Sequence, residues 1–237
     1  AGGMTGDTAR DNKAKSVAFF DVDGTIIDTT IVHYFVYFQL RRLPRWKARI
    51  WFPWFMAKCG VYLAMDRINR GVLNSVFYRN YAGIPVAETR AAAADCVRRI
   101  SNSKWLAGAR EKIQEHRNAG QEIVLVTGSL DFLMESLAGE LGGAGVLAAR
   151  LEERDGRFTG RLAGGPVIAG EKRRRMLEYA KRNRVEMKQC HAYGDSSADL
   201  PMLEAVGFPH AVNPDRKLRA VAQERNWPIH DWPVEKK

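Results

Sequence analysis

Two carboxylates lie two residues apart in FFDVDGT, the segment Phe19–Thr25. Residues i and i+2 of an extended chain face the same side, so Asp21 and Asp23 can act together. Carboxylates held this close repel each other, and a bound cation or a shared proton would relieve the repulsion. One of them could attack a phosphate ester and form an acyl phosphate, while the other protonates the leaving oxygen and then activates water. Gly24 lets the chain turn sharply beside them.

A second acidic pair occurs in YGDSSADLPML, the segment Tyr193–Leu203. Asp195 and Asp199 are four residues apart, so a helical turn would place them on one face. Together with Asp21 and Asp23 they would supply the oxygen ligands that Mg²⁺ prefers. Taken alone, such a pair more often caps a helix.

Thr127 and Lys172 could complete a phosphate site. In VLVTGS, Thr127 is followed by Gly128 and Ser129, so a hydroxyl and turn N–H groups could bind phosphate oxygens. Lys172 stands at the expected start of a helix, and one cation would offset the charge of the nucleophile and the transferring phosphoryl group. Neither residue is specific evidence by itself.

Short apolar runs precede three of these polar groups, which indicates buried strands. The runs are residues 16–21, 122–127 and 189–194. Helical patterns lie between and after them, at residues 106–118, 131–141 and 172–182. This alternation predicts an α/β fold with a doubly wound parallel, Rossmann-like sheet, whose ligands bind at the carboxyl ends of the strands. Asp155-Gly156, between residues 145–152 and 157–162, predicts a small β-hairpin.

The region between the first two strands differs, because it is rich in aromatic residues and has helical periodicity. We interpret residues 29–103 as an inserted α-helical cap, in which Pro44 and Pro53 should start or break helices and Val86–Ile100 forms one amphipathic helix. The core would then comprise residues 16–28 and 104–237. Residues 1–15 are polar and predict a disordered, tag-like N-terminus outside the fold.

DVDGT, a strand-end Thr, a Lys and GDSSAD occur in this order along the chain. In this order they resemble the motifs of the haloacid dehalogenase superfamily, and the cap position resembles its phosphoserine-phosphatase-like branch, subfamily IB. The resemblance implies that Asp21 is the nucleophile, Asp23 the general acid and base, and Thr127 and Lys172 phosphate ligands. It implies Mg²⁺ held by Asp21, the Asp23 carbonyl and Asp195, with Asp199 in support. The phosphate-binding turns would include Gly24, Gly128 and Ser129.

The substrate is less well defined by this resemblance. Phosphoserine phosphatases have a Glu soon after the first motif to hold the substrate ammonium, and this chain has no Glu between Gly24 and Ala87. Asp28 could substitute, and Arg67 or Arg70 could read a substrate carboxylate. We therefore expect a Mg²⁺-dependent phosphomonoesterase whose substrate is a small phosphomonoester, either phosphoserine-like or a lipid head-group phosphate. The alternatives are a phosphomutase or a catalytically weak protein that binds anionic lipid.

Charge points to an anionic partner. The chain of 237 residues has a net charge of +10, and its 46% hydrophobic content is typical of a globular protein. Residues 28–87 carry nine basic residues and two Asp, beside Trp46, Trp51, Trp54 and Phe55. Basic residues with tryptophan suggest a membrane interface, and the cap would then resemble that of bacterial phosphatidylglycerophosphatase C. The simpler interpretation, which we favour, is that these aromatics form the core of the cap.

Motifs and signals that are missing from the sequence guide our expectations about further partners and about location. No nucleic-acid motif accompanies the positive charge, so we expect no specific nucleic acid partner. There is no secretory signal or transmembrane stretch, and the three cysteines form no CxxC pair. We expect a cytoplasmic protein, with a peripheral membrane contact kept as an option, that is either a monomer or a homodimer.

Overall fold

A six-stranded parallel sheet forms the centre of the molecule. The computed structural model describes residues 15–68 and 70–235, and of residues 63–68 and 70–72 it describes the backbone only. The strand order is β3-β2-β1-β6-β7-β8, so β1 lies between β2 and β6. The strands are β1 (Val17–Phe20), β2 (Glu122–Leu130), β3 (Gly145–Ala149), β6 (His191–Gly194), β7 (Phe208–Val212) and β8 (Ile229–His230).

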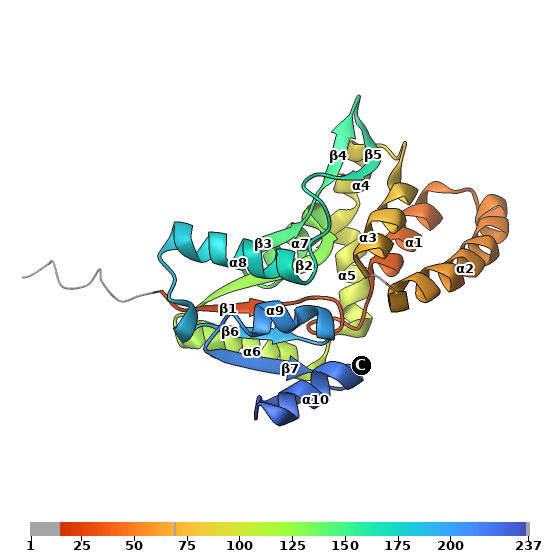
Figure 1. Cartoon of the computed structure of the whole chain (residues 1–237). Coiled ribbons are helices and arrows are strands. Elements are labelled where there is room, and N and C mark those ends of the chain that lie inside the picture. The colour runs from red at the N-terminus through yellow and green to blue at the C-terminus, as the bar shows by residue number, and fades with distance from the viewer. Residues whose placement is uncertain (1–14, 69, 236–237) are drawn as a thin grey trace, which may run out of the picture.

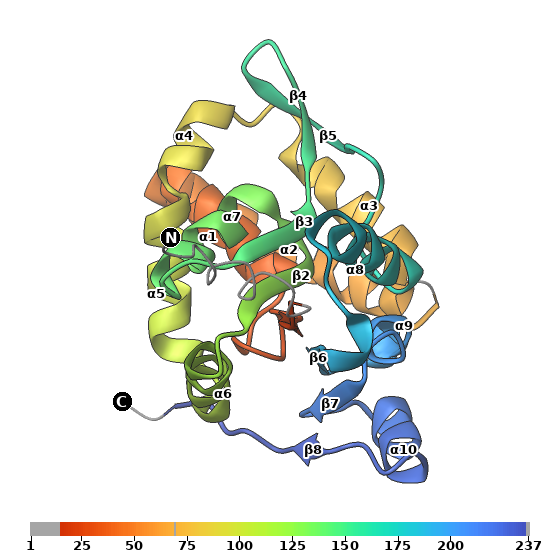
Figure 2. The same ribbon diagram turned by 90° about the vertical axis from the view of Figure 1, so that its left-hand side faces the viewer.

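Helices cover both faces of the sheet (Figures 1 and 2). One face is covered by α6 (Ala107–Asn118) and α7 (Asp131–Glu140), and the other by α8 (Gly170–Asn183), α9 (Leu200–Leu203) and α10 (Arg216–Glu224). Alternate residues of β1 serve the two layers: Ala18 and Phe20 pack in the cluster that includes α6, and Val17 and Phe19 in the cluster that includes α8. The predicted doubly wound α/β sheet is therefore confirmed.

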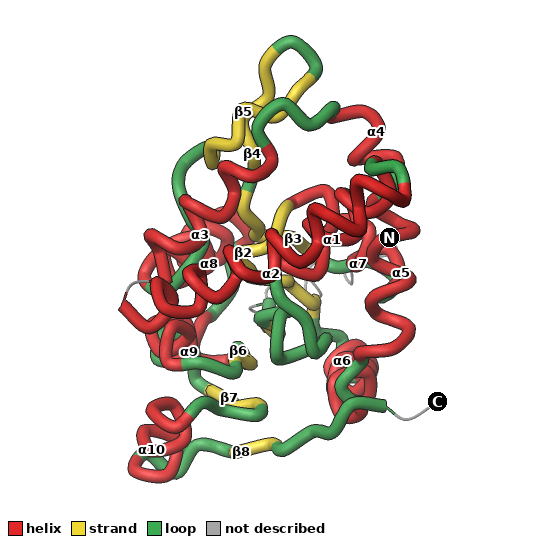
Figure 3. The backbone as a smooth tube through the Cα atoms, turned by 90° about the vertical axis from the view of Figure 1, so that its right-hand side faces the viewer, coloured by secondary structure: helices red, strands yellow, loops and turns green. Residues whose placement is uncertain are grey.

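Six α-helices of the described chain lie between β1 and β2, and the first five of them gather beyond one end of the sheet (Figures 1 and 3). These five are α1 (Ile31–Arg42), α2 (Arg45–Ile68), α3 (Arg70–Tyr78), α4 (Val86–Ala91) and α5 (Ala93–Lys104), with the short 3₁₀ helix η1 (Arg79–Tyr81). The two connections to the core run side by side, because Asp28 N–H donates to the Lys104 carbonyl and Leu106 N–H to the Ile26 carbonyl. This agrees with an inserted helical region, although the division into two domains stays a prediction.

The predicted hairpin is present as β4 (Leu151–Arg154) and β5 (Arg157–Leu162), with both Asp155 and Gly156 at positive φ. It reaches up to the cap (Figure 1), where Gly83 N–H donates to the Phe158 carbonyl and Phe158 N–H to the Ile84 carbonyl. The hairpin thus ties the cap to the core. The strand expected over residues 145–152 is two strands, because the chain passes from the main sheet to the hairpin at Arg150.

Two expectations about the cap helices were wrong. Pro44 precedes α2 as expected, but Pro53 lies inside this 24-residue helix and does not end it. The loss of one backbone hydrogen bond is outweighed there by the packing of Phe55 and Tyr62. The single helix expected over Val86–Ile100 is interrupted at Ala92, whose ψ of −5° separates α4 from α5.

The cap aromatics do not all form its core, which corrects the interpretation that we favoured. Phe55 is buried and Trp51 stacks on it with ring centroids 4.7 Å apart, but Trp46 and Trp54 are 63% and 61% exposed. The N-terminal segment expected to be disordered lies outside the described residues, except that Lys15 bridges to Val185. No helix among residues 15–68 and 70–235 is long and apolar enough to cross a membrane.

Candidate active site

Three neighbouring strands bring the predicted site residues to one edge of the sheet. Asp21 directly follows β1, Thr127 lies near the end of β2, and Asp195 directly follows β6. The pairing of β1 with β6 continues into the site, because Asp21 N–H donates to the Tyr193 carbonyl at 2.9 Å. The edge opens into a pocket of about 560 Å³ between the sheet and the cap helices. This is the carboxyl edge at which doubly wound sheets bind ligands.

Lys172 joins two of the carboxylates inside this pocket. Its Nζ lies 2.8 Å from Asp21 Oδ1 and 2.6 Å from Asp199 Oδ1, and all three side chains are buried. Burial acts to lower the pKa of Lys172, but attraction from Asp199 and Asp21 outweighs it and raises the pKa above its ordinary value. The lysine is therefore a fixed positive charge next to Asp21.

The Asp21 carboxylate is less easily ionised than an exposed one. Burial raises its pKa to about 7, Lys172 opposes this effect, and the charges of Asp199 and Asp23 add to it. A second cation near Asp21 would lower this pKa and favour the ionised form. Lys172 alone is therefore not enough to keep the Asp21 carboxylate fully ionised at neutral pH.

Asp23 is held by hydroxyl groups from β2. Ser129 Oγ donates to Asp23 Oδ2 at 2.6 Å, and Thr127 Oγ1 lies 3.4 Å from the same oxygen. Burial raises the pKa of Asp23, which these hydrogen bonds and Lys172 only partly oppose. The hydroxyl of buried Tyr34, from α1, also faces Asp23, and burial and this carboxylate raise the pKa of the tyrosine. A carboxyl group in such surroundings can hold a proton and give it up again.

Gly24 brings Asp195 against the loop that carries the first two carboxylates. Its φ is +87°, and a Cβ built on it would lie 2.5 Å from Asp195 Oδ2. Only glycine suits a position with this φ and this close approach. One carboxylate oxygen each from Asp21, Asp195 and Asp199 lie within 4.8 Å of one another, a spacing that suits one metal ion.

Asp199 differs from the other two because both of its oxygens already have partners. Oδ1 accepts from Lys172, and Oδ2 accepts from the backbone N–H and the hydroxyl of Ser196 at 3.2 and 3.1 Å. Asp199 ends the 3₁₀ helix η3 (Ser197–Asp199), which Ser196 caps. Gly194 makes room for this turn, since a Cβ there would lie 2.7 Å from the Asp199 Cβ. Asp199 is thus well placed to orient Lys172.

The cap closes the pocket with a largely apolar wall. The described cap residues that line it are Thr29, Thr30, Ile31, Val32, Cys59, Tyr62, Leu73, Asn74 and Phe77. Tyr78 Oη donates to the Gly128 carbonyl at 2.7 Å, which fastens α3 to the end of β2. Asp28 also lines the pocket, but its side chain is 61% exposed and lies 3.8 Å from Lys104 Nζ.

The structure thus brings the predicted catalytic, phosphate-binding and metal-binding residues together at one place. The sequence did not predict all of the contacts between them. Ser129 contacts Asp23 instead of standing free to bind phosphate. Four residues were missed: Tyr34, Asn74, Tyr78 and Ser196. The first three lie on cap helices, whose packing no motif reports, whereas Ser196 could have been found from the S-x-x-D capping spacing. The side chains of Arg67 and Arg70 lie outside the described residues.

Three of the five histidines of the sequence form a row of contacts away from the pocket. His191 Nδ1 lies 3.1 Å from His210 Nε2, and His210 Nδ1 lies 3.1 Å from His230 Nε2. His116, on α6, contacts the Tyr193 hydroxyl at 2.8 Å. Burial and the neighbouring histidines lower the pKa of His210 to about 3, and burial lowers that of His191 to about 4. These imidazoles are neutral at pH 7 and belong to the packing between the sheet and α6.

Comparison with known proteins agrees with this geometry. A family model described as haloacid dehalogenase-like hydrolase matches residues 18–204. The chain is 33% identical over 226 residues to phosphoserine phosphatase SerB1 of Mycobacterium tuberculosis, covering 94% of this chain and 72% of the relative. It is 26% identical to a histidinol-phosphatase of Neisseria meningitidis, covering 91% of this chain and 98% of the relative.

A solved structure shares the whole fold. A protein of unknown function from Bordetella pertussis has a TM-score of 0.77 and 25% identity, covering 92% of this chain and 99% of that one. The chain therefore belongs to the haloacid dehalogenase-like hydrolases, as a phosphatase of the phosphoserine-phosphatase-like branch.

Proposed function

We propose that the chain hydrolyses small phosphomonoesters through an aspartyl-phosphate on Asp21, with Mg²⁺ as cofactor. The observation that carries the proposal is the Asp21 carboxylate at the end of β1, fixed 2.8 Å from the buried Lys172 ammonium and two residues away from Asp23. A carboxylate held beside a cation can approach an anionic phosphate, which an isolated carboxylate would repel.

The two half-reactions divide between the two aspartates. An Asp21 oxygen forms a bond to phosphorus as the bond to the ester oxygen breaks, and protonated Asp23 gives its proton to that leaving oxygen. Asp23, now ionised, takes a proton from a water molecule that attacks phosphorus, and the bond to Asp21 breaks. Inorganic phosphate leaves, and Asp23 is protonated again. The raised pKa of Asp23 suits both steps.

Thr127 and Lys172 would bind the phosphoryl oxygens during both steps. Lys172 also touches Asp21, so it supplies positive charge where the nucleophile and the phosphate meet. The Gly24 and Ser129 N–H groups already donate to the Ile27 carbonyl and to Thr127 Oγ1, so they would have to exchange these acceptors to bind a phosphoryl oxygen. Ser129 also keeps Asp23 in position through its hydroxyl.

The donor set fits Mg²⁺. Four carboxylates, those of Asp21, Asp23, Asp195 and Asp199, face one lysine among the described pocket residues, which leaves an excess of negative charge in a buried site. Hard oxygen donors suit Mg²⁺, which would neutralise the phosphate and the carboxylates when bound. Asp21, Asp195 and the Asp23 carbonyl would hold it. Asp199 would support it indirectly, because hydrogen bonds already occupy both of its oxygens.

The residues of the pocket wall restrict the charge and polarity of the leaving groups that fit. Apart from the four aspartates of the site, Asp28 is the one acid among the described residues that line the pocket, and Lys104 partly neutralises it. This gives weak support for a substrate ammonium at Asp28, as phosphoserine would require. The side chains of Ile31, Val32, Leu73 and Phe77 favour a leaving group with an apolar part, which a lipid head-group phosphate or an amphiphilic small ester would provide.

Phosphate release from a panel of esters tests the proposal. The panel contains phosphoserine, histidinol phosphate, sugar phosphates and a short-chain lipid phosphate, each with Mg²⁺, with chelator and with the Asp21→Asn variant. We expect Mg²⁺-dependent release that falls at least about 10³-fold in Asp21→Asn. Isomer formation without free phosphate would indicate a phosphomutase instead. No release from folded, Mg²⁺-loaded protein on any ester would contradict the proposal.

A further inference from the structure

The helix α2 carries an unusual concentration of exposed apolar side chains. Of the ten large apolar side chains that the described residues expose, six lie on this helix: Trp46, Ile50, Phe52, Trp54, Met56 and Val61. Trp46, Ile50 and Trp54 are each more than 60% exposed. Large exposed apolar patches on folded proteins commonly mark the sites at which they bind other proteins or membranes.

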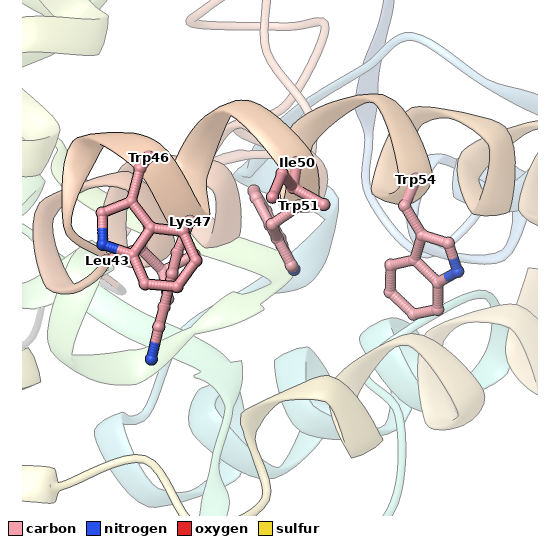
Figure 4. Close-up of a pocket in the computed structure, with 6 residues that line it drawn as sticks. All are labelled: Leu43, Trp46, Lys47, Ile50, Trp51 and Trp54. Carbon is pink, nitrogen blue, oxygen red and sulfur yellow. The ribbon is translucent and has the colours of Figure 1, made fainter.

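Three of these residues form one stripe along the helix. Trp46, Ile50 and Trp54 are spaced four residues apart, so they lie on one face, as Figure 4 shows. With Leu43, Lys47 and Trp51 they line an open apolar groove of about 520 Å³. We call Trp46, Lys47, Ile50 and Trp54 the α2 docking face. It stands at the outer edge of the cap, where α2 projects away from the sheet (Figure 1).

All charged side chains of the segment that carries the α2 docking face are positive, although Arg41 at its start pairs with Asp95. From Arg41 to Met65 the sequence contains six basic residues and no acid. Two lysines lie over the exposed indoles: Lys47 Nζ is 5.2 Å from the Trp46 ring and Lys58 Nζ is 5.5 Å from the Trp54 ring. The face therefore presents aromatic rings and ammonium groups together, which is complementary to a partner that is apolar and anionic at once.

We propose that the α2 docking face binds the surface of an anionic lipid bilayer. A helix with tryptophan and aliphatic side chains among lysines and arginines lies in the plane of such a surface, with its apolar side in the acyl boundary and its cations at the head groups. Indoles favour that boundary because the ring is apolar and its N–H can still be hydrated. No spanning helix is needed, and the described chain has none.

A second copy of the chain is a poorer occupant. Two-fold pairing through this face would place the same patch against itself, so the arginines and lysines of one copy would meet those of the other. An anionic bilayer offers the opposite charge over the whole face. The same helix contributes Cys59 and Tyr62 to the pocket wall, so bilayer contact and pocket lie on one element. Bilayer binding by the α2 docking face does not depend on the proposed phosphatase function. Any effect of the bilayer on turnover would depend on that function.

Vesicle sedimentation of the whole chain tests the inference. Vesicles of phosphatidylglycerol and phosphatidylcholine are compared with pure phosphatidylcholine, for wild type and for the triple variant Trp46→Gln, Ile50→Gln, Trp54→Gln. We expect wild type to bind the anionic vesicles at low salt and the triple variant to bind them at least tenfold more weakly. A second variant, Arg45→Gln with Lys47→Gln, should lose about fivefold for each charge removed.

The matched control removes exposed apolar side chains elsewhere. Leu177→Gln with Phe208→Gln changes residues that are 41% and 50% exposed but lie on α8 and β7, and it should bind like wild type. Tryptophan fluorescence on anionic vesicles should shift to the blue in wild type and in this control, and less in the triple variant. All of these variants should keep their turnover of a soluble phosphomonoester, since none of the changed residues lines the active-site pocket.

Several results would overturn the inference. Wild type that stays in the supernatant with anionic vesicles at low salt would do so, as would equal binding by the triple variant and wild type. Light scattering that shows a wild-type dimer and a monomeric triple variant, without vesicle binding, would assign the face to a second copy. Absent turnover of soluble esters together with wild-type vesicle binding would contradict the proposed function alone.

Discussion

The ammonium of Lys172 bridges two carboxylates, because its Nζ lies 2.8 Å from Asp21 Oδ1 and 2.6 Å from Asp199 Oδ1. Asp199 directly precedes α9. All three side chains are buried, so each charge depends on the others for its stability. The same contacts that place a cation beside the proposed nucleophile therefore also hold the carboxyl edge of the sheet together. Changes at Lys172 should affect stability as well as activity.

Replacing Lys172 by Met should lower the free energy of unfolding by about 3 kcal/mol in the absence of Mg²⁺, because two buried carboxylates lose their partner. Urea denaturation measures the change. Adding Asp199→Asn to the variant should restore part of the loss. The control is Lys112→Met, whose pair with Glu115 is partly exposed and should contribute less than about 1 kcal/mol. Equal effects of the two lysine variants would contradict this account of the buried pair.

Substitution of Gly24 tests whether the loop after β1 must lie in close contact with Asp195. Gly24→Ala places a methyl group within 2.5 Å of Asp195 Oδ2 at a φ of +87°, so the carboxylate or the loop has to move. We expect kcat/KM to fall at least about 10²-fold, since small misplacements of reacting groups have effects of this size.

The control for that variant is Gly139→Ala. Gly139 lies in α7 with open space around its Cα, so alanine there should leave turnover unchanged and stabilise the helix by about 0.5–1 kcal/mol. A Gly24→Ala enzyme with wild-type kcat/KM would show that the loop yields easily and that Asp195 need not hold its place.

Mg²⁺ should stabilise the folded chain, because it would bind the buried carboxylates only after the strands bring them together. At a concentration about 100-fold above its dissociation constant, the gain is about 2.7 kcal/mol. Thermal denaturation with Mg²⁺ and with chelator measures it. Asp195→Asn should remove most of the gain, while Asp155→Asn, at the exposed hairpin tip, should not. An identical gain in both variants would place the ion elsewhere.

Much of the core could be predicted from the sequence because its signals are local. The strands that precede Asp21 and Asp195 and the strand that contains Thr127 are short apolar runs, and their carboxyl ends must meet once the sheet is parallel, although β2 continues past the expected end at Thr127 to Leu130. The motif residues could therefore be placed without knowledge of the side-chain contacts.

The cap was harder to predict because packing, not local propensity, decides its structure. Pro53 stays within α2 because Trp51 before it and Phe55 and Tyr62 after it pack on the cap core. The aromatic spacing alone could not show that Phe55 turns inward while Trp46 and Trp54 remain exposed. Nor could it show that Tyr78 reaches Gly128, which depends on how α3 meets the sheet.

The histidines beneath α6 predict a loss of stability in acid. Folding lowers the pKa of His191 to about 4 and that of His210 to about 3, from about 6.5 in the unfolded chain. Between these values the unfolded chain binds more protons at these two histidines, so their contribution to the free energy of unfolding falls as the pH falls below about 6.5. Asp21, whose pKa folding raises to about 7, contributes in the opposite direction, so the histidine effect is read from the difference between variant and wild type. Because both rings are only partly buried, solvent screening reduces the contribution of each histidine to this loss to on the order of 1 kcal/mol by pH 5.

Urea denaturation from pH 7.5 to 5 measures that slope, and the variant His210→Gln should reduce it because glutamine cannot be protonated. Lys112 on α6 also lowers the pKa of both imidazoles, so Lys112→Gln should make the slope slightly smaller. His33→Gln, at an exposed position near the start of α1, serves as the control and should change the slope less than His210→Gln. A slope in His210→Gln equal to that of wild type would mean that His210 takes up its proton in the folded chain without cost, and that its row of contacts with His191 and His230 does not depend on a neutral ring.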